Sequence, residues 1–479
     1  MYINRNIHLQ YLLLLICLLI SRPSNGQVTL NIDDYDVSTR KYENGNIFQK
    51  DAILFYAMLE ETHPYYSQNS LKQAVRKSYN TLKNCKSNKE FKRILQSSIS
   101  ELNDSHTMID YEYAVDSIFP IRLDFVHDSA YISAISTHYS ELLGSGVTSI
   151  NNLTISDLVS RSNIVLSNEN IDRLYYLISQ QMQFKEFWDY IESNSDSLVV
   201  ELENKTKHVI VPEKRSDIRV VTTNTYDPNT TPRKALYYYD FRNDSTICYF
   251  QFNAFMDQLT EGNASLPRFD EFICQMFEKI QSSGTKLLVV DLQYNKGGNS
   301  ILGDILLSYL KPLEDLCKYN VSFRYSTLLE STYPYYKNIR TSSGERLEYG
   351  EMYGLSDIAN DESYIDGYIY NKDPDKIFKG NIVFIMGDTS YSSAGLLLTT
   401  AYDNNIGTIV GIPSTFSPNS FGDILFWRLP HTGVKGYVSY KSFIRPNMKA
   451  EPSNNLFPNI YVDNMNNVWD IILNNYEKL

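Results

Sequence analysis

The stretch Ile382-Val-Phe-Ile-Met-Gly-Asp-Thr-Ser-Tyr-Ser-Ser-Ala-Gly395 decides the fold class of this chain. Its first five residues form a short apolar run with the β-branched and aromatic content of a buried strand. Turn formers at 387–390 interrupt this run, and the small and leucine-rich residues at 394–402 then predict a helix. Residues 407–411 return to a strand pattern. The stretch therefore predicts a strand–turn–helix–strand unit of an α/β fold.

Ser392 falls near the start of the predicted helix, at the bend that follows the strand. At this place its hydroxyl can project from the edge of a sheet. An oxyanion beside it would meet backbone N–H groups and the positive end of the helix dipole. These features suit a catalytic nucleophile. The alternative is that Ser392 is only the N-cap of the helix, a position at which serine is common.

Composition places the chain among globular proteins and argues against one class of partner. Its 479 residues are enough for roughly two or three domains. Apolar residues make up 43% and charged residues 21%, which allows a sizeable core. The net charge of −12, a pI near 5.2 and the lack of a Lys/Arg-rich run argue against nucleic-acid binding.

Residues 1–26 have the pattern of a cleaved signal peptide. Arg5 supplies a positive n-region, residues 11–20 form an apolar h-region, and Ser24-Asn-Gly26 provides small residues at the cleavage site. The apolar run is too short to span a bilayer comfortably, and nothing later in the chain resembles a membrane span. We therefore expect a secreted or periplasmic protein that begins at Gln27 and has no transmembrane span.

Four scattered cysteines remain after the signal peptide, and they do not demand disulfides in a chain of this size. No clustered Cys/His spacing suggests a zinc site, so we expect no metal. No organic cofactor is indicated either.

The mature chain divides into four predicted segments: a helical domain at 27–115, a small module at 116–221, a linker at 222–236 and an α/β core at 237–479. One helical face in the first segment carries apolar residues at helical spacing, namely Phe91, Ile94, Leu95, Ile99 and Leu102. The linker is rich in Thr, Asn and Pro. In the core, strands and helices alternate, with a tyrosine-rich insertion at 325–379.

A second motif, Asp291-Leu-Gln-Tyr-Asn-Lys-Gly-Gly298, follows another buried strand of the core. Two adjacent glycines let the backbone turn sharply and approach a ligand closely. Their N–H groups can form an anion-binding nest. The alternative is an ordinary glycine turn between a strand and a helix.

Together the two motifs resemble those of the tail-specific, or C-terminal processing, family of serine peptidases. That family has an Asp-Leu-Arg-x-Asn-x-Gly-Gly loop and, about a hundred residues later, a Ser-Ala-Ser/Ala-Glu nucleophile turn. Residues 144–154 are similar to a PDZ signature, with Asn152 where glycine is usual. The resemblance implies a crotonase/ClpP-like α/β peptidase core, preceded by a helical segment and a diverged PDZ-like module.

The chain departs from this family at two places. Gly395 replaces the glutamate of the nucleophile turn, and the position of the activating lysine falls at Ser417, in Gly411-Ile-Pro-Ser-Thr-Phe-Ser-Pro-Asn419. A serine hydroxyl has far too high a pKa to act as the base. The enzyme therefore uses another base, or it is inactive.

His106 is the candidate base. The segment Leu102-Asn-Asp-Ser-His-Thr107 resembles the Leu-x-Asp-Gly-His-Thr segment of the branch similar to the tricorn core, in which histidine is the base. An imidazole can take the proton of Ser392 and return it to the leaving amine. The alternatives are a loop histidine without a catalytic role and, as a second candidate base, His63 in a His-Pro pair that more often is structural.

A carboxylate or hydroxyl normally orients the other nitrogen of a catalytic histidine. By resemblance to the tricorn-like branch this group is Glu451, although Asp104 and Ser105 are close to His106 in sequence and could serve instead. The family pattern also places the oxyanion hole at the backbone N–H groups of Gly297 or Gly298 and of Ser393.

These residues favour a serine endopeptidase that hydrolyses protein or peptide substrates bound in extended form. The alternative is a catalytically inactive protein on the same fold that binds peptides or small apolar ligands. The missing lysine and Gly395 favour this alternative.

Overall fold

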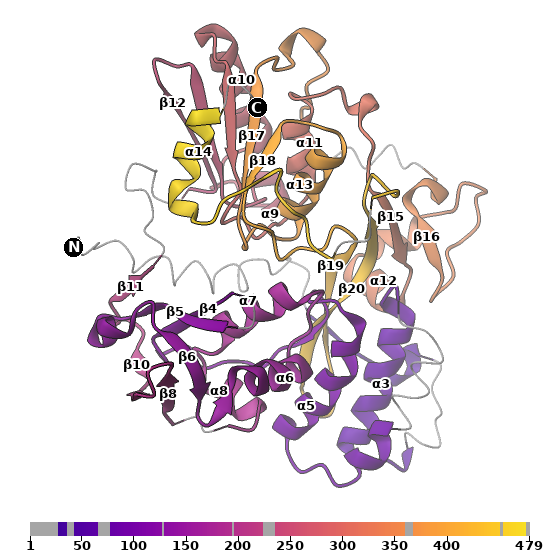
Figure 1. Ribbon diagram of the computed structural model, residues 1–479. Helices are drawn as coiled ribbons and strands as arrows, with labels where there is room; N and C mark the ends of the chain where they lie inside the picture. The colour runs from indigo at the N-terminus through magenta and orange to yellow at the C-terminus, as the bar shows by residue number, and fades with distance from the viewer. Residues whose placement is uncertain are drawn as a thin grey trace. The chain divides into compact units, whose positions relative to one another are not determined.

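The structure is a computed structural model that describes residues 27–35, 43–65, 77–126, 129–193, 196–223, 235–359, 367–450 and 454–475 (Figure 1). The expected signal peptide, Glu451 and most of the expected linker lie outside the described residues. None of the described helices combines the length and apolar character that crossing a bilayer requires.

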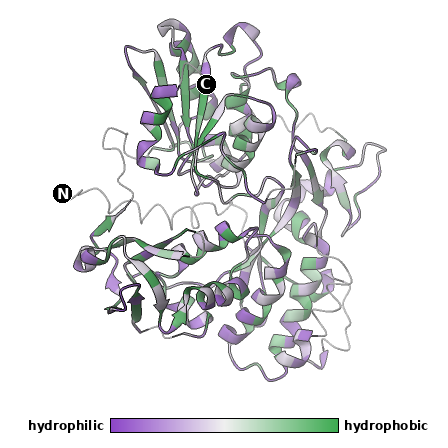
Figure 2. Cartoon of the chain, viewed as in Figure 1, coloured by the Kyte–Doolittle hydropathy of each residue, from purple (hydrophilic) through white to green (hydrophobic). Residues whose placement is uncertain are grey.

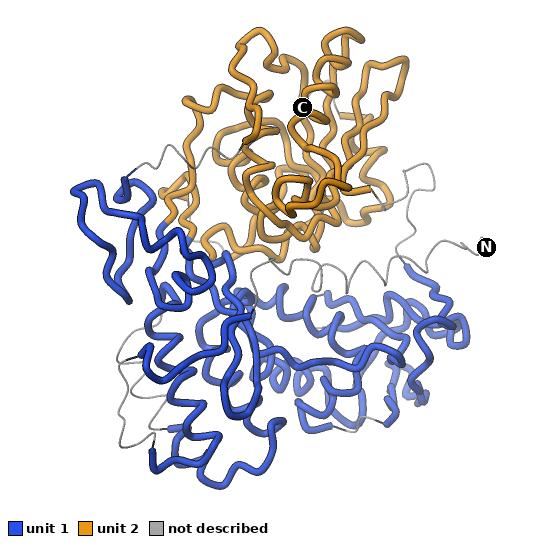
Figure 3. The backbone as a smooth tube through the Cα atoms, turned by 180° about the vertical axis from the view of Figure 1, so that it is seen from behind, with its two compact units in different colours: residues 1–223, 322–359, 421–442 blue, residues 224–321, 360–420, 443–479 orange. Residues whose placement is uncertain are grey.

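The chain forms two compact units, and each is built from several separate segments (Figure 3). Unit 1 comprises residues 1–223, 322–359 and 421–442, and unit 2 comprises residues 224–321, 360–420 and 443–479. Two segments of the C-terminal half thus pack within unit 1. The linear domain boundaries expected from the sequence follow a different division and stay a prediction.

Unit 2 contains a six-stranded sheet in the order β12-β13-β14-β17-β18-β21. β12 pairs antiparallel with β13, and the other pairings are parallel. The strands span Tyr237–Arg242 (β12), Ile247–Phe252 (β13), Leu287–Asp291 (β14), Asn381–Met386 (β17), Thr408–Gly411 (β18) and Ile460–Tyr461 (β21). The predicted strand–turn–helix–strand unit is formed by β17, the helix α13 (Ser393–Asp403) and β18.

Helices cover both faces of this sheet. Leu288 and Val290 of β14 join a core with α10 (Phe269–Ser283), α11 (Ile301–Leu307) and α13. Leu287 and Val289 face the opposite core, which includes α14 (Val468–Asn475). Because both faces are buried, the central strands are continuous apolar runs, visible as green arrows in Figure 2. The short helix α9 (Gln258–Glu261) follows β13.

The described part of unit 1 contains two larger sheets with separate cores. The first has the order β1-β19-β20-β15-β16, with β2 paired to β20. Its strands span Val28–Thr29 (β1), Met108–Ile109 (β2), Asn320–Arg324 (β15), Met352–Gly354 (β16), Ser420–Arg428 (β19) and Lys435–Ile444 (β20). Its core includes α3 (Ile47–Thr62), α5 (Asn88–Ile99) and α12 (Thr327–Thr332). The apolar face predicted around Phe91 packs in this core.

The second sheet of unit 1 lies in the expected small module and has the order β11-β5-β6-β8-β9, with β4 on β5 and β7 on β6. Its strands span Ile121–Val126 (β4), Ser129–Ser136 (β5), Gly146–Ile150 (β6), Leu153–Thr154 (β7), Leu198–Leu202 (β8), Lys207–Ile210 (β9) and Val220–Thr222 (β11). β3 (Ser117–Ile118) and β10 (Glu213–Lys214) form a separate pair. The helices are α6 (Ile155–Val165), α7 (Ile171–Gln181) and α8 (Lys185–Tyr190). The PDZ-like description of this module stays a prediction.

Candidate active site

The two motifs of the core meet at one edge of the sheet of unit 2. β14 and β17 are parallel neighbours, with Asp291 paired to Ile385, so the segments that follow them leave from the same carboxyl edge. Gly297 lies directly against Ser392: a Cβ atom added to Gly297 would be 2.7 Å from Ser392 Cβ and 2.8 Å from the backbone nitrogen of Ser393. Any side chain at position 297 would therefore displace the serine turn.

Ser392 occupies a backbone conformation that L-residues rarely adopt. It is the N-cap residue of α13, with φ 53° and ψ −123°, yet its side chain makes no capping hydrogen bond. The alternative expectation of a simple capping serine therefore does not hold. A conformation of this kind costs the fold about 1–3 kcal/mol and is typical of functional sites, including strained nucleophile turns.

Hydrogen bonds between the two motifs hold the serine turn in place. The Tyr391 N–H donates to the carbonyl of Asn295 at 3.0 Å. The Ser390 hydroxyl donates to the Leu292 carbonyl at 2.8 Å and accepts the N–H of Gly387 at 3.0 Å. The strain at Ser392 is thus held by the fixed residues before it and by the helix that begins after it.

The backbone donors beside Ser392 are not equivalent. The N–H of Gly297 donates to Asn295 Oδ1 at 2.8 Å, so it is occupied. No described atom accepts the N–H of Gly298 or of Ser393. The Ser393 hydroxyl donates to the Gly298 carbonyl at 2.6 Å and so links these two residues. Of the two glycines expected as alternatives, the geometry favours Gly298 as an oxyanion donor, together with Ser393.

His106 lies in unit 1, on a turn between the 3-10 helix η2 (Ser100–Leu102) and β2. Asn103 ends η2 in the left-handed conformation, with φ 51°. The carboxylate of Asp104 accepts the N–H of His106 at 2.8 Å, which closes a tight turn. The histidine turn is therefore fixed by its own sequence, and the His106 side chain remains partly exposed, at 16%.

Asp104 anchors this turn to its surroundings. Its Oδ2 atom lies 3.1 Å from His63 Nε2 and accepts the Thr107 hydroxyl at 2.6 Å. Burial opposes ionisation, but the hydrogen bond from His63, its attraction and that of His106, and the bond from Thr107 outweigh burial. They hold the pKa of the Asp104 carboxyl at about 2. The carboxylate is thus charged and saturated with donors at neutral pH.

His63 is a support for Asp104. Its imidazole is fully buried, and Nδ1 accepts the N–H of Tyr65 at 3.2 Å. With Nδ1 occupied as an acceptor, Nε2 carries the proton that it donates to Asp104. A buried imidazole with both nitrogens engaged cannot reach a substrate, so His63 does not serve as an alternative base.

Glu169 also lies beside His106, although no pattern in the sequence predicts this contact. It is in the loop between α6 and α7, and its Oε1 atom is 3.9 Å from His106 Nδ1. Ligand atoms of Asp104, His106 and Glu169 lie within 4.8 Å of one another, so this group could hold a cation. Hydrogen-bond donors already engage oxygens of both carboxylates, which suits the orientation of an imidazole better.

The sequence of residues 246–450 matches the family described as Peptidase family S41. Residues 246–450, which include both motifs of the core, therefore form a domain of peptidase family S41, and the protein is a serine-type peptidase. No curated protein is similar enough in sequence to match.

Three solved structures share the fold of this chain at low sequence identity. Mature CPAF in complex with lactacystin is 15% identical, with a TM-score of 0.59 over 90% of this chain and 97% of the CPAF chain. Mature CPAF alone is 15% identical, with a TM-score of 0.58 over 90% and 96% of the two chains. A mutant of CPAF is 14% identical, with a TM-score of 0.59 over 88% and 94%.

Both departures from the tail-specific pattern occur at one place in this S41 peptidase. A Cβ atom on Gly395 would lie 2.2 Å from Cδ1 of Phe416, so the aromatic ring fills the space beside the first turn of α13. The neighbouring Ser417, at the expected lysine position, is buried. Phe416 also packs edge-on against Tyr391. The loop after β18 thus packs onto the serine turn and leaves no space for a glutamate at 395.

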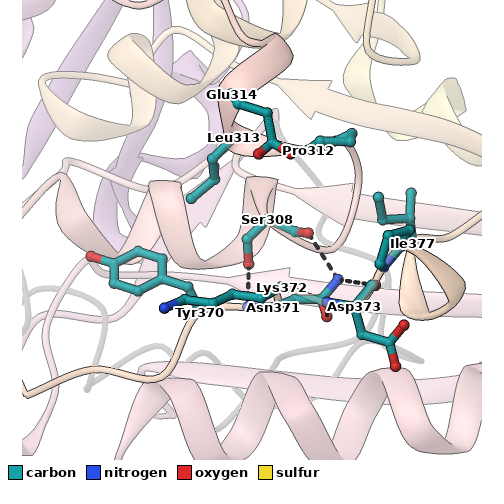
Figure 4. Close-up of a pocket in the computed structure, with 10 residues that line it drawn as sticks. Ser308, Pro312, Leu313, Glu314, Tyr370, Asn371, Lys372, Asp373 and Ile377 are labelled. Atoms are coloured by element: carbon teal, nitrogen blue, oxygen red, sulfur yellow. Dashed lines mark hydrogen bonds between the residues drawn. The ribbon is translucent and has the colours of Figure 1, made fainter.

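A separate cavity of about 460 Å³ in unit 2 is lined by Ser308, residues 312–314, residues 370–374 and Ile377 (Figure 4). The Asn371 side chain closes one wall by donating to the Ser308 carbonyl at 3.1 Å. Neither motif of the active site contributes to its lining. This cavity is therefore distinct from the surroundings of Ser392.

Proposed function

We propose that this S41 member is a secreted or periplasmic endopeptidase of the tail-specific type and that it uses a Ser–His mechanism. The observation that carries the proposal is the strained Ser392, whose hydroxyl does not cap α13 and whose Cβ lies against Gly297. An ordinary capping serine needs no such strain. The crotonase/ClpP-like description of the core and the PDZ-like module are part of this proposal.

In this mechanism the Ser392 hydroxyl attacks the scissile carbonyl while His106 takes its proton. The N–H groups of Gly298 and Ser393 then stabilise the tetrahedral oxyanion; one such donor contributes roughly 3 kcal/mol to transition-state stabilisation. His106 returns the proton to the leaving amine, and water repeats the cycle on the acyl-enzyme. Glu451 is the carboxylate that the family resemblance assigns to the histidine.

Labelling with a fluorophosphonate probe tests this function. The wild-type protein should be labelled, Ser392→Ala should abolish labelling, and His106→Ala should reduce it strongly. His138→Ala, which alters an exposed histidine of unit 1, is the matched control and should label normally. If the wild-type protein is not labelled at any pH, the result favours the alternative hypothesis of a catalytically inactive binding protein. A peptide-library digest would then define the cleavage specificity of a protein that labels.

The expected location has a separate test. N-terminal sequencing of the protein recovered from the medium or periplasm should begin at Gln27. Recovery of an uncleaved chain with Met1 would contradict the expected export.

A further inference from the structure

We propose that Glu169 is a positioning residue for His106 and that it holds the imidazole with the proton on Nδ1, so that Nε2 is the atom that exchanges a proton. The proposal rests on the proposed function, because it assumes that His106 is the base. It assigns a role to a residue of the small module, outside both motifs of the core and outside the histidine segment.

The geometry around the imidazole supports this role. Glu169 Oε1 and Asp104 Oδ1 lie 3.9 Å and 3.8 Å from the same atom, His106 Nδ1. Two carboxylates on one side of the ring favour a proton on Nδ1, which leaves Nε2 with a lone pair. Both distances are longer than a hydrogen bond, but contacts between catalytic groups are often long in a free enzyme and tighten in the substrate complex.

Asp104 and Glu169 differ in what they hold. Asp104 binds the backbone N–H of His106 and the side chains of His63 and Thr107. Its main effect is therefore to fix the backbone conformation of the turn. Glu169 binds the turn through the hydroxyl of Ser105, which is 2.9 Å from both of its carboxylate oxygens. Its carboxylate is therefore held beside the ring.

Arg173 fixes this arrangement from α7. Its Nε atom donates to the Ser105 hydroxyl at 3.2 Å. The Glu169 side chain is only 4% exposed, so water screens its charge weakly. A carboxylate so placed stabilises the imidazolium that forms when His106 takes the proton of the nucleophile.

The test compares Glu169→Gln with Glu213→Gln in the full chain. Glutamine keeps the shape and removes the charge. Glu213 is the matched control because its Oε1 lies 3.2 Å from Nδ1 of another histidine in the same unit, His138. We measure the rate of fluorophosphonate labelling and, in protein with ¹⁵N-labelled histidine, the tautomer of His106, whose signals are assigned by their loss in His106→Asn.

Glu169→Gln should slow labelling at least roughly tenfold and move His106 away from the Nδ1–H tautomer, whereas Glu213→Gln should change neither. Unchanged labelling and tautomer in Glu169→Gln would overturn the proposal. Slower labelling with an unchanged tautomer would overturn it as well, because it would reveal only a structural effect. The tautomer of His106 is also measured in the Ser392→Ala background. There it tests the effect of Glu169 on His106 even if Ser392 is not the nucleophile. The same measurements on Glu451→Gln show whether the carboxylate expected from the family acts on the same atom.

Discussion

A serine in a conformation suited to glycine costs the fold about 1–3 kcal/mol, and Ser392 has φ 53° and ψ −123°. The cost persists because Tyr391 and Ser390 are bound to the neighbouring loop on one side and α13 begins on the other. In that conformation the residue is pressed against Gly297 instead of capping the helix. At the scale of single residues, the fold loses stability at the position where the proposed mechanism needs a fixed hydroxyl.

Ser392→Gly should therefore stabilise the protein. Glycine relieves the strained φ but loses some conformational entropy, so we expect a net gain of about 1 kcal/mol, equivalent to about 1–2 °C in Tm for a chain of this length. Ser392→Ala keeps the strain and should leave Tm nearly unchanged, although both variants should lose probe labelling. Thermal unfolding followed by circular dichroism measures the difference. Equal Tm values for the two variants would show that Ser392 is not strained.

Gly395→Ala should destabilise the protein even though alanine is normally the better helix former by about 1 kcal/mol. The reason is Cδ1 of Phe416, 2.2 Å from the added Cβ, and overpacking of this kind costs about 1–3 kcal/mol. The cost should largely disappear in a Phe416→Ala background, as a double-mutant cycle in urea would measure. Gly303→Ala in α11 is the control, because its nearest atom is 3.3 Å away. Additive effects would contradict the packing argument.

At the scale of elements, local pattern predicted the parts of the site that lie on regular structure. The apolar runs of β14 and β17 and the helix α13 appear where strand and helix patterns place them. Local pattern could not reveal that Phe416 fills the space beside Gly395, or that Glu169 lies beside His106. Both are contacts between loops, and no periodicity in the sequence encodes them.

The stability of the turn that carries His106 should depend on pH through the carboxyl of Asp104. In the folded chain the pKa of this carboxyl is about 2, below the ordinary value of 3.8, so the unfolded chain binds the proton more tightly. The resulting stability, about 2 kcal/mol, is complete above pH 4 and is lost as the pH falls through 2. The advantage of the wild type over Asp104→Asn should therefore shrink between pH 4 and pH 2, as urea unfolding at several pH values would measure.

Asp51 is a control for which we expect the opposite dependence of stability on pH. Burial raises the pKa of its carboxyl despite hydrogen bonds from Thr432 and His431. The folded chain then binds that proton more tightly than the unfolded chain. The advantage of the wild type over Asp51→Asn should therefore decrease as the pH rises above 4. A difference between wild type and Asp104→Asn that does not change with pH would contradict the role given to the Asp104 charge.

At the scale of the whole molecule, the chain passes between the two units near residues 223, 321, 359, 420 and 442. The pairing of β2 with β20 joins Met108 to Tyr437, and Asn88 donates to the carbonyl of Thr432. A strand pattern shows that a segment will pair but does not name its partner, so these long-range pairings could not be read from the sequence. His106 belongs to unit 1 and Ser392 to unit 2, and the proposed chemistry requires both units.

Crosslinking tests whether these two positions meet. A Ser–His mechanism needs Nε2 within hydrogen-bond reach of Oγ, about 2.6–3.2 Å, during catalysis. A His106→Cys/Ser392→Cys variant should therefore be linked within one chain by a short bis-alkylating reagent, in a background in which the partly exposed Cys274 and the exposed Cys317 are serine. Mass spectrometry of the joined peptides measures the yield. The exposed His138, also in unit 1 but without a role in the proposed mechanism, gives the comparison pair His138→Cys/Ser392→Cys, and the yield for the pair at 106 should be higher. Equal yields for the two pairs, or no link at 106, would contradict the assignment of His106 as the base for Ser392.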